Sequence, residues 1–553
     1  MPAPVTITFL GGLGEIGRNC AAFEAHGRIV LLDCGLMFPD TDMLGVDLVL
    51  PDFGWLLDRA DDIDGVILTH GHEDHVGSLQ YLLAEVMVPV YASELTLGLA
   101  RGRLEEAGLK NLQLIPVKDG ERRRIGPFEC EFLPVTHSVP HGFATAFHTE
   151  QGTILHSGDF KLDLTPVDGR LTDLARIGAL ASGEGIRLLL SDSTNADQHG
   201  HARSETSIGT VLYDLMHDNI GRRVITACFA SHIHRVQQIA DAAVAFNRVI
   251  APLGRSMRRN IGLARDMGVL NIPERSLIDI EDIDKFEPGQ VCIVSTGSQG
   301  EPMSALTLMS GNENRWLKIT PDDTVILSSH PIPGNENAVT KVIDNLVRLG
   351  AEVVHSGISD VHATGHAKSE DLKLFLSVAR PDWFTPVHGE YRHLVAHGRL
   401  ARLMGVADDH VVVAEDGDTL VLDDQGAHLG DRVPAEYIYV HGTVGDISHG
   451  TLGERRILGD EGVVAVIVCV DLQTRDLIAG PEVATRGWVA QEDASDLAKR
   501  VVERVRTNVV AALTEKQGLD VAGLEKVVRR AAGSTVSELT RRRPMIVPVV
   551  VQA

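Results

Sequence analysis

The 553-residue sequence lacks a long hydrophobic run, a signal peptide and any closely spaced pair of cysteines. A membrane-spanning helix needs about 20 consecutive apolar residues, so the missing run excludes such a helix. The first residues, MPAPVTITFLGG, have neither a basic start nor a cleavage site and predict a β-strand. The six cysteines are scattered without a CxxC motif, several of them in apolar strand-like runs. We therefore expect buried free thiols in a cytoplasmic protein that has no membrane partner.

Positive charge is also scarce, and the net charge is −25 at pH 7. Proteins that bind nucleic acids usually show a basic footprint. Small basic clusters do exist, each most simply a solvated surface, at residues 122–124, 222–223, 255–259 and 541–543. Divalent cations held by carboxylates would also change the local field. The net charge therefore does not exclude a nucleic-acid substrate.

The rest of the composition is that of a large globular protein. An apolar fraction of 44% and this length allow three or four domains. Short β-like runs such as RIVLLD alternate with helical patterns such as RVQQIADAAVAF, which predicts an α/β fold. After about residue 450 the pattern changes to strand, amphipathic helices and a closing strand. We expect a small αβ module there.

A glycine pattern near the N-terminus resembles a dinucleotide-binding fingerprint. Gly12-Leu13-Gly14-Glu15-Ile16-Gly17 follows a predicted strand, and Asp33 lies at the distance of a ribose-binding acid. That function requires a helix directly after the glycines. The segment CAAFEAHGRIVLLDCG instead predicts two short strands. We therefore interpret the glycines as a tight turn between strands.

The segment HGHEDH, residues 70–75, is the strongest chemical signal in the chain. It follows the predicted strand GVILT and precedes a predicted helix, so its side chains lie on one loop. They cannot all bind one ion, but they can serve two ions about 3.5–4 Å apart. We expect His70 and His72 on one ion and Asp74 and His75 on the other. Glu73 has no obvious place on either ion.

Matching ligands recur at the ends of other predicted strands. They are His137 in PVTHS, Asp159 in HSGDFK and His388 in TPVHGEYRHL. Each follows an apolar run that would deliver its side chain to the same edge of a sheet. Asp159 is the natural bridging carboxylate. Imidazole nitrogens with carboxylate oxygens suit zinc, and manganese where oxygen ligands dominate.

HGHEDH, followed in order by the His137, Asp159 and His388 segments, resembles the metallo-β-lactamase superfamily. Further segments make the chain similar to the β-CASP nucleases and, within them, to the bacterial ribonuclease J family. These segments are SDSTNA (191–196), FASHIHRVQQ (229–238), GRSM (254–257), STGSQGEP (295–302), PIPGNEN (331–337), HATGHA (362–367) and PVHGEYRHL (386–394). The match is collinear from about residue 5 to 445, and the terminal module also fits that family's C-terminal domain.

The resemblance implies an α/β fold built on an αββα metallo-β-lactamase sandwich. An inserted α/β β-CASP domain interrupts the sandwich, and a small C-terminal αβ domain follows it. The expected ranges are 1–209 and 369–448 for the two parts of the sandwich, 210–368 for the insertion, 449–460 for a linker and 461–553 for the C-terminal domain.

The resemblance also implies metal-dependent hydrolysis of RNA phosphodiester bonds. Asp192, His366 and His388 correspond to the three β-CASP motifs, and a histidine at the third favours RNA over DNA. Asp74 would act through its metal, and Asp192 would orient its neighbours. His366 would stabilise charge on the phosphorus or protonate the leaving oxygen.

The family acts as a 5′-to-3′ exonuclease that favours 5′-monophosphorylated single-stranded RNA, and some members are also endonucleases. These activities serve RNA decay and the processing of rRNA and mRNA. The implied phosphate-binding residues are Ser231, His232, Ile233, His362, Ala363, Thr364, Gly365 and His366. Backbone amides of the small residues and two hydroxyls would contact the anion. His199 and His201 lack a partner motif, and we expect them to be loop residues.

The implied cofactors are two Zn²⁺ ions, with Mn²⁺ or Mg²⁺ as alternatives in activity. Some relatives also hold a structural Ca²⁺ through an aspartate in a VDG segment. Here the segment is Val440-His441-Gly442, and hard cations prefer oxygen ligands, which argues against that site. The implied partners are single-stranded RNA, a second copy in a homodimer or homotetramer, and an RNA-degradation complex.

Two other functions stay open at this point. A small-molecule hydrolase of the same superfamily is disfavoured by the long insertion with its own strand-end motifs. A non-catalytic RNA-binding paralogue is disfavoured because all seven metal ligands are present. Release of nucleotides from labelled RNA would distinguish the nuclease from both.

Overall fold

The computed structural model describes residues 2–40, 42–301, 303–332, 335–515 and 519–553. Pro302, Pro333 and Gly334, which belong to the segments of the family resemblance, lie outside these ranges. The chain divides into two compact units, and each is described by itself. The first comprises Met1–Phe38 and Val49–Ile438, and the second comprises Pro39–Leu48 and Tyr439–Ala553. Strands β5 (Leu48–Leu50) and β23 (Ile438–His441) lie where the chain passes between units.

The first unit contains two large sheets. Within the described residues, one sheet has the order β22-β21-β1-β3-β4-β6-β7-β8 and the other β19-β13-β12-β11-β10-β9. The first is formed by β1 (Val5–Gly11), β3 (Cys20–Ala25), β4 (Arg28–Leu32), β6 (Ile63–Ile67), β7 (Val90–Ala92), β8 (Leu114–Pro116), β21 (Thr419–Asp423) and β22 (Gly426–Leu429). The second is formed by β9 (Arg122–Ile125), β10 (Phe128–Val135), β11 (Gly142–Thr149), β12 (Gly152–His156), β13 (Ile186–Asp192) and β19 (Trp383–Val387).

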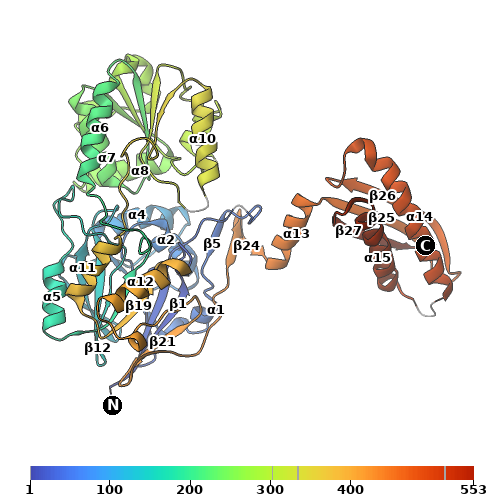
Figure 1. Ribbon diagram of the computed structural model, residues 1–553, viewed down its shortest axis with the longest axis horizontal. Coiled ribbons are helices and arrows are strands. Elements are labelled where there is room, and N and C mark those ends of the chain that lie inside the picture. The colour runs from blue at the N-terminus through green and yellow to red at the C-terminus, as the bar shows by residue number, and fades with distance from the viewer. Residues whose placement is uncertain (1, 41, 302, 333–334, 516–518) are drawn as a thin grey trace. The chain divides into compact units, whose positions relative to one another are not determined.

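The two sheets pack face to face, and helices cover their outer faces (Figure 1). The helices are α1 (Gly54–Leu57), α3 (Leu79–Glu85) and α4 (Glu94–Glu106) on one side, and α5 (Leu174–Ser182), α11 (Ser369–Ala379) and α12 (Tyr391–Leu403) on the other. Successive residues of a strand point to opposite faces. In β10, Phe132 therefore lies in the core between the sheets, and Leu133 packs against the outer helices. This arrangement confirms the expected αββα sandwich.

A third sheet, parallel throughout, is inserted between β13 and α11. Its order is β15-β16-β14-β17-β18. The strands are β14 (Arg223–Ala227), β15 (Val249–Leu253), β16 (Val291–Ser295), β17 (Asp323–Leu327) and β18 (Glu352–Val354). One face is covered by α6 (Thr206–Asp218), α7 (Ile233–Ala245) and α8 (Arg255–Asp266), and the other by α9 (Ala305–Ser310) and α10 (Glu336–Arg348). The insertion is thus an α/β domain, as expected. Its core includes α6, which begins at Thr206, before the expected start of the insertion at residue 210. The range 210–368 stays a prediction.

The second unit contains a small sheet of order β26-β25-β27. The elements of this unit are β24 (Thr443–Ile447), α13 (His449–Asp460), β25 (Val463–Asp471), β26 (Asp476–Arg486), α14 (Gln491–Glu515), α15 (Val521–Thr540) and β27 (Met545–Gln552). Val464, Val466 and Val468 of β25 are buried against α14 and α15. The opposite face exposes Ile467, Val549 and other apolar side chains. This unit confirms the expected C-terminal αβ domain.

Two further sequence predictions can be compared with the fold. All six cysteines are free thiols, five of them buried, which confirms the predicted cysteine state. The glycine segment joins the antiparallel strands β1 and β3 through the two-residue strand β2 (Leu13–Gly14), so the turn is confirmed. In the described ranges, no helix combines the length and the apolar character needed to span a membrane.

Candidate active site

The HGHEDH loop begins at the carboxyl end of β6 and passes into α2 (Glu73–Val76), a single helical turn. The neighbouring strand β4 continues into residues 33–36, which hold α2 in place. Cys34 N donates to His75 O at 2.8 Å, and Leu36 N donates to Glu73 O at 3.0 Å. A Cβ on Gly35 would lie 1.6 Å from Asp74 O, so only glycine permits this approach. Two adjacent strand ends therefore determine where the loop presents its ligands.

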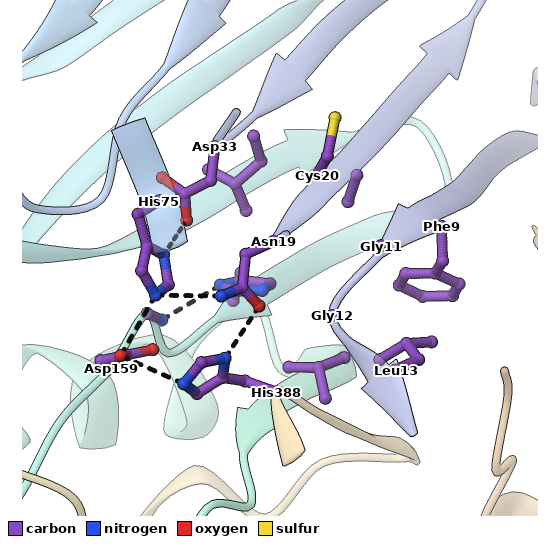
Figure 2. Close-up of a pocket in the computed structure, with 15 residues that line it drawn as sticks. Phe9, Gly11, Gly12, Leu13, Asn19, Cys20, Asp33, His75, Asp159 and His388 are labelled. Atoms are coloured by element: carbon purple, nitrogen blue, oxygen red, sulfur yellow. Dashed lines mark hydrogen bonds and ion pairs between the residues drawn. The ribbon is translucent and has the colours of Figure 1, made fainter. Parts of the chain in front are cut away.

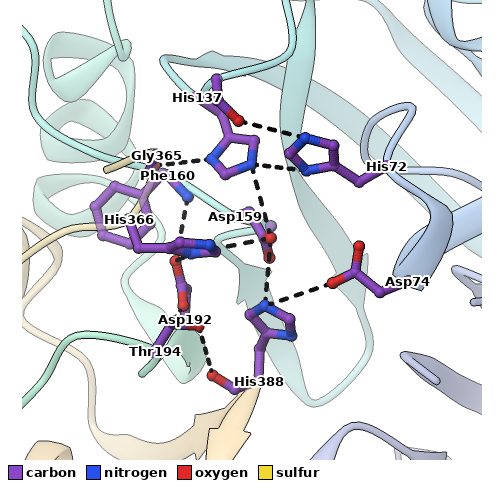
Figure 3. Close-up of polar contacts among 12 residues, drawn as sticks. His72, Asp74, His137, Asp159, Phe160, Asp192, Thr194, Gly365, His366 and His388 are labelled. Atoms are coloured by element: carbon purple, nitrogen blue, oxygen red, sulfur yellow. Dashed lines mark hydrogen bonds and ion pairs between the residues drawn. The ribbon is translucent and has the colours of Figure 1, made fainter. Parts of the chain in front are cut away.

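All seven predicted metal ligands converge at one place. Figure 3 shows His72, Asp74, His137, Asp159 and His388 of this group. Ligand atoms of His70, His72, His137 and Asp159 lie within 4.8 Å of one another. Those of Asp74, His75, Asp159 and His388 form a second such group, so Asp159 belongs to both. His72 Nδ1 lies 3.0 Å from His70 Nε2 and 3.1 Å from His137 Nε2. The pairing that the sequence predicted is therefore geometrically available.

Asp159 stands at the centre of the cluster. Its Oδ2 is buried and has no hydrogen-bond partner in the described part of the chain. The surrounding imidazole nitrogens lie at 3.2 Å (His75 Nε2), 3.4 Å (His388 Nε2), 3.7 Å (His70 Nε2) and 3.9 Å (His137 Nε2). A buried carboxylate oxygen that lacks a hydrogen bond and is surrounded by ring nitrogens would be stabilised by cations between these groups. The donor set therefore fits divalent metal ions.

The charge states of three of the imidazoles agree with metal binding. Burial, reinforced by neighbouring imidazoles, lowers the pKa of His70 and His137 well below the ordinary value. Burial lowers the pKa of His72 to about 4. These three rings are therefore neutral at pH 7, and each keeps a lone pair for a metal.

Three hydrogen bonds select which ring nitrogen faces the cluster. His75 Nδ1 donates to Asp33 Oδ2 at 2.8 Å, and His388 Nδ1 donates to Asn19 Oδ1 at 2.8 Å (Figure 2). His137 Nδ1 donates to Gly365 O at 2.8 Å. In each ring the other nitrogen, Nε2, faces the cluster and binds a metal when the ring is neutral. Burial disfavours the charged form of His75, but Asp159, Asp33 and Asp74 outweigh it and raise the pKa of His75 well above the ordinary value, so a metal that binds this ring has to displace a proton.

Sequence reasoning missed Asn19 and Gly365 as orienting groups and considered Asp33 only as a ribose ligand. The signal for Asp33 was present, because an aspartate ends the apolar strand RIVLLD beside the strand that carries the HGHEDH loop. Asn19 follows the glycine turn and also donates from Nδ2 to Asp74 O at 3.0 Å. No spacing in the sequence links it to His388.

Asp192 and His366 form a pair beside the metal ligands. Asp192 ends β13, and its Oδ1 accepts from Thr194 N at 3.0 Å. Its Oδ2 lies 2.8 Å from His366 Nδ1, which in turn lies 3.9 Å from Asp159 Oδ2. Burial opposes protonation of His366, but the Asp192 carboxylate outweighs it and raises the pKa of His366 to about 9. The structure thus places a protonated imidazole next to the cluster.

The predicted phosphate-binding residues lie on two loops of the insertion. Ser231 is half-buried just before α7, and His232 is buried at the helix N-cap position. His232 Nε2 lies 3.4 Å from Glu205 Oε1, and burial lowers its pKa to about 4. The side chains of Ile233 and Ala363 belong to the apolar core of the insertion. Only the backbone of these two residues is available to a ligand.

On the second loop, Thr364 and His362 present polar atoms. Thr364 Oγ1 accepts from Asn195 Nδ2 at 2.9 Å and from His366 N at 3.2 Å. Among the residues that the structure describes, His362 Nδ1 is buried and has no hydrogen-bond partner. A Cβ on Gly365 would lie 2.6 Å from His137 Cε1, so glycine lets this loop approach the His/Asp cluster.

The other residues singled out from the sequence lie apart from the cluster. Glu73 pairs with Arg103 on α4. His201, in the loop after β13, pairs with Asp371 at 2.8 Å. His441 is half exposed, with its Nδ1 3.9 Å from Asp47 Oδ2, and the prediction about calcium stays a prediction.

Four protein-family models match the chain, in the order of the domains. They describe the metallo-β-lactamase superfamily (residues 13–194), the ribonuclease J β-CASP domain (221–346), a Zn-dependent metallo-hydrolase RNA specificity domain (350–414) and the ribonuclease J C-terminal domain (450–553). The first and third together contain the residues of the cluster.

Relatives match over the whole length. A protein named ribonuclease J from Mycobacterium tuberculosis is 43% identical, covering 100% of this chain and 99% of the relative. One named ribonuclease J 1 from Streptococcus pyogenes is 37% identical over 99% of this chain and 98% of its own. A crystal structure of a protein of unknown function from Enterococcus faecalis has a TM-score of 0.53 at 14% identity, covering 76% of this chain and 100% of its own. That last likeness concerns the fold alone.

Proposed function

Because this chain belongs to the ribonuclease J family and is a metal-dependent ribonuclease, we propose that it degrades single-stranded RNA from the 5′ end and favours a 5′-monophosphate. Internal cleavage of RNA would use the same catalytic residues. The observation that carries the proposal is the Thr364 hydroxyl, which lies on a loop shared with the metal centre.

Two zinc ions would occupy the cluster, with Mn²⁺ or Mg²⁺ able to replace them in activity. His70, His72 and His137 would hold one ion, and Asp74, His75 and His388 the other, with Asp159 shared. Bound ions would supply Lewis acidity for a water nucleophile and neutralise charge on the scissile phosphate. Asp33, Asn19 and the Gly365 carbonyl keep the ligand imidazoles in the required tautomer.

His366 is the proton donor in this proposal. Its Nδ1 is held by Asp192, and its pKa of about 9 keeps the ring protonated at pH 7. The opposite nitrogen is therefore a donor that can protonate the leaving 3′ oxygen. Asp192 orients the ring and stabilises its positive charge.

The 5′-phosphate would bind between Ser231 and Thr364. Because Thr364 Oγ1 already accepts two hydrogen bonds, its own proton remains to be donated. In the described structure, no side chain caps α7, so its first N–H groups and its dipole also favour an anion. The unpaired His362 Nδ1 adds a polar atom to the same loop.

The phosphate loop and the metal centre are connected through consecutive residues. Thr364 would contact the terminal phosphate, Gly365 O holds the ligand His137, and His366 would donate the proton. A phosphate bound at Thr364 is therefore at a set distance from the metals. This spacing supports removal of nucleotides one at a time.

We also propose that the chain forms a homodimer or homotetramer through its C-terminal domain. The free face of the small sheet carries Ile467, Val547, Val549 and Val551, which are 37–48% exposed. A contiguous exposed apolar surface of this kind favours burial against a partner.

The test uses one RNA sequence prepared in three forms, whose 5′ end carries a monophosphate, a triphosphate or a hydroxyl. We expect Mn²⁺- or Zn²⁺-dependent release of mononucleotides, fastest from the monophosphorylated RNA. A circular RNA of the same sequence measures internal cleavage. Equal rates on all three linear substrates would contradict the 5′-phosphate preference but not the ribonuclease activity.

A further inference from the structure

Arg235 is a fully buried cation that does not belong to the phosphate-binding residues predicted above. It lies in the first turn of α7, directly after His232, Ile233 and His234, and its side chain is 0% exposed. Burying a charge costs free energy unless the charge is paired and hydrogen-bonded. The hydrogen-bond partners of this guanidinium therefore show which segments of the insertion it connects.

One side of the guanidinium binds Glu205. Nε donates to Oε1 at 2.7 Å and Nη2 donates to Oε2 at 3.0 Å. Two parallel hydrogen bonds to a carboxylate give a strong and geometrically specific pair. Glu205 is the residue before α6, and its Oε1 also faces His232.

The other side binds two loops at the carboxyl ends of the sheet. Nη1 donates to Ser328 O at 2.9 Å and to Ser328 Oγ at 2.6 Å, just after β17. The same nitrogen donates to Val361 O at 2.9 Å, in the residue before His362. Arg235 therefore ties the start of α7, which directly follows Ser231 and His232, to the loop that carries His362 and Thr364.

The position of these segments in the sheet points to a ligand site. β14 and β17 are neighbours, and the chain leaves them in opposite directions, from β14 to β15 on one side and from β17 to β18 on the other. In parallel sheets, ligands bind in the crevice outside the carboxyl ends of strands at such a reversal. Arg235 connects segments that leave the sheet at this reversal, because it binds Ser328 just after β17 and Val361.

A second buried arginine in the same domain shows that burial alone does not explain these contacts. Arg248 is 2% exposed and donates to Asn219 O at 2.7 Å and to Arg222 O at 2.8 Å. These carbonyls lie at the amino ends of the strands, away from the phosphate-binding loops. Arg248 is therefore a matched reference for a buried arginine whose role is structural.

We propose that Arg235, held by Glu205, is a positioning residue that sets the spacing between Ser231 and Thr364 and so fits the site to a single terminal phosphate. This inference rests on the proposed function of those residues as the 5′-phosphate site. The guanidinium acts through the two loops and does not touch the RNA. Lysine cannot replace it, because a lone ammonium lacks the planar fork that reaches Glu205 and both loops together.

The experiment compares the wild type with Arg235→Lys, Arg248→Lys and Thr364→Val, all as full-length chains. For each protein, kcat/KM is measured on one RNA with a 5′-monophosphate, 5′-triphosphate or 5′-hydroxyl. We expect Arg235→Lys to lower the monophosphate-to-triphosphate ratio about tenfold or more, mainly through KM on the monophosphorylated RNA. Arg248→Lys should leave the ratio unchanged. Glu205→Gln provides a second test, because it weakens the ion pair with Arg235 and leaves the Arg235 side chain unchanged.

The outcomes separate this inference from the proposed function. An unchanged ratio in Arg235→Lys and Glu205→Gln, with a lowered ratio in Thr364→Val, overturns the role of Arg235 and leaves the phosphate site in place. A wild type that treats the three RNA ends equally overturns the site, and this inference with it. Equal losses on all three RNAs in both lysine variants would assign Arg235 a structural role and overturn the inference. If Arg235→Lys does not fold, the monophosphate-to-triphosphate ratio of Glu205→Gln alone decides whether the inference holds.

Discussion

His366 Nδ1 lies 2.8 Å from Asp192 Oδ2, although 174 residues separate the two positions. Asp192 ends a strand of the sandwich, and His366 stands on the chain that returns from the insertion. Their contact joins the two domains at the place where the ligands of both proposed metals meet. Chemistry that needs a positioned proton therefore depends on the docking of one domain on the other.

Replacing Asp192 with asparagine should lower kcat for RNA by roughly 10²–10⁴-fold, because His366 loses the charge that keeps it protonated and oriented. Metal content, measured on the purified variant, should equal that of the wild type. A variant with normal kcat would show that the pair has no part in proton transfer. A variant without metal would show that Asp192 acts on the metal ligands instead.

Asp74→Ala combined with His75→Ala should abolish RNA cleavage while the protein stays folded. Both side chains stand on one loop at the cluster, outside the apolar cores. Elemental analysis should show the loss of one metal equivalent per chain. Replacing Glu73, which pairs with Arg103 and not with the cluster, is the matched control on the same turn. Wild-type turnover by the double variant would refute the assignment of two metals.

Thr364→Val should reduce kcat/KM on monophosphorylated RNA about tenfold or more, because a hydrogen bond to a charged phosphate is lost. Thr364→Ser keeps the hydroxyl and should retain most of the activity. Cleavage of circular RNA, if measurable in the wild type, should persist in both variants because the cluster is unchanged. Equal kcat/KM values for Thr364→Val and Thr364→Ser on monophosphorylated RNA would show that the 5′-phosphate binds elsewhere.

Ile467→Lys with Val549→Glu should dissociate the proposed oligomer without loss of the folded C-terminal domain. The two side chains are 40% and 39% exposed on paired positions of β25 and β27. Light scattering on the full-length variant reports the mass, and a chain that ends near residue 450 should give the same result. Leu403→Lys, at a 70% exposed position of α12, serves as the control. An unchanged mass in both altered chains would exclude this face as the interface.

His397 should make the stability of the metal-free protein depend on pH. Burial lowers its pKa to about 3, while a histidine in an unfolded chain titrates near 6.5. Between these pH values the unfolded state binds more protons at His397 than the folded state does. The contribution of His397 to the free energy of unfolding is therefore largest above about pH 6.5 and decreases as the pH falls. From pH 6.5 to 5.5 the wild type should lose about 1 kcal/mol more than His397→Gln, measured by urea unfolding in EDTA. Parallel losses in the two proteins would contradict this contribution.

Much of the fold followed from local patterns. Apolar runs ending in histidine or aspartate predicted both the strands and the edge at which their ligands meet, because parallel and neighbouring strands bring their ends together. The amphipathic pattern of the terminal helices likewise predicted a small αβ module, and Val501, Val505 and Val509 do lie together in its core. The exact beginning of the insertion could not be read in this way, since α6 looks like any amphipathic helix until its partner sheet is known.

The predicted metal-binding chemistry followed from the sequence alone, because seven candidate ligands of distinctive type stand in short motifs at strand ends. The orientation of these side chains became visible only in the folded chain, where Asp33, Asn19 and the Gly365 carbonyl hold three of the imidazoles. Folding alone also brought Arg235 against Glu205 and the two loops that are proposed to bind phosphate. Orienting groups are chemically ordinary and act across long separations in the chain. Their roles exist only once folding has brought a donor within about 3 Å of its acceptor.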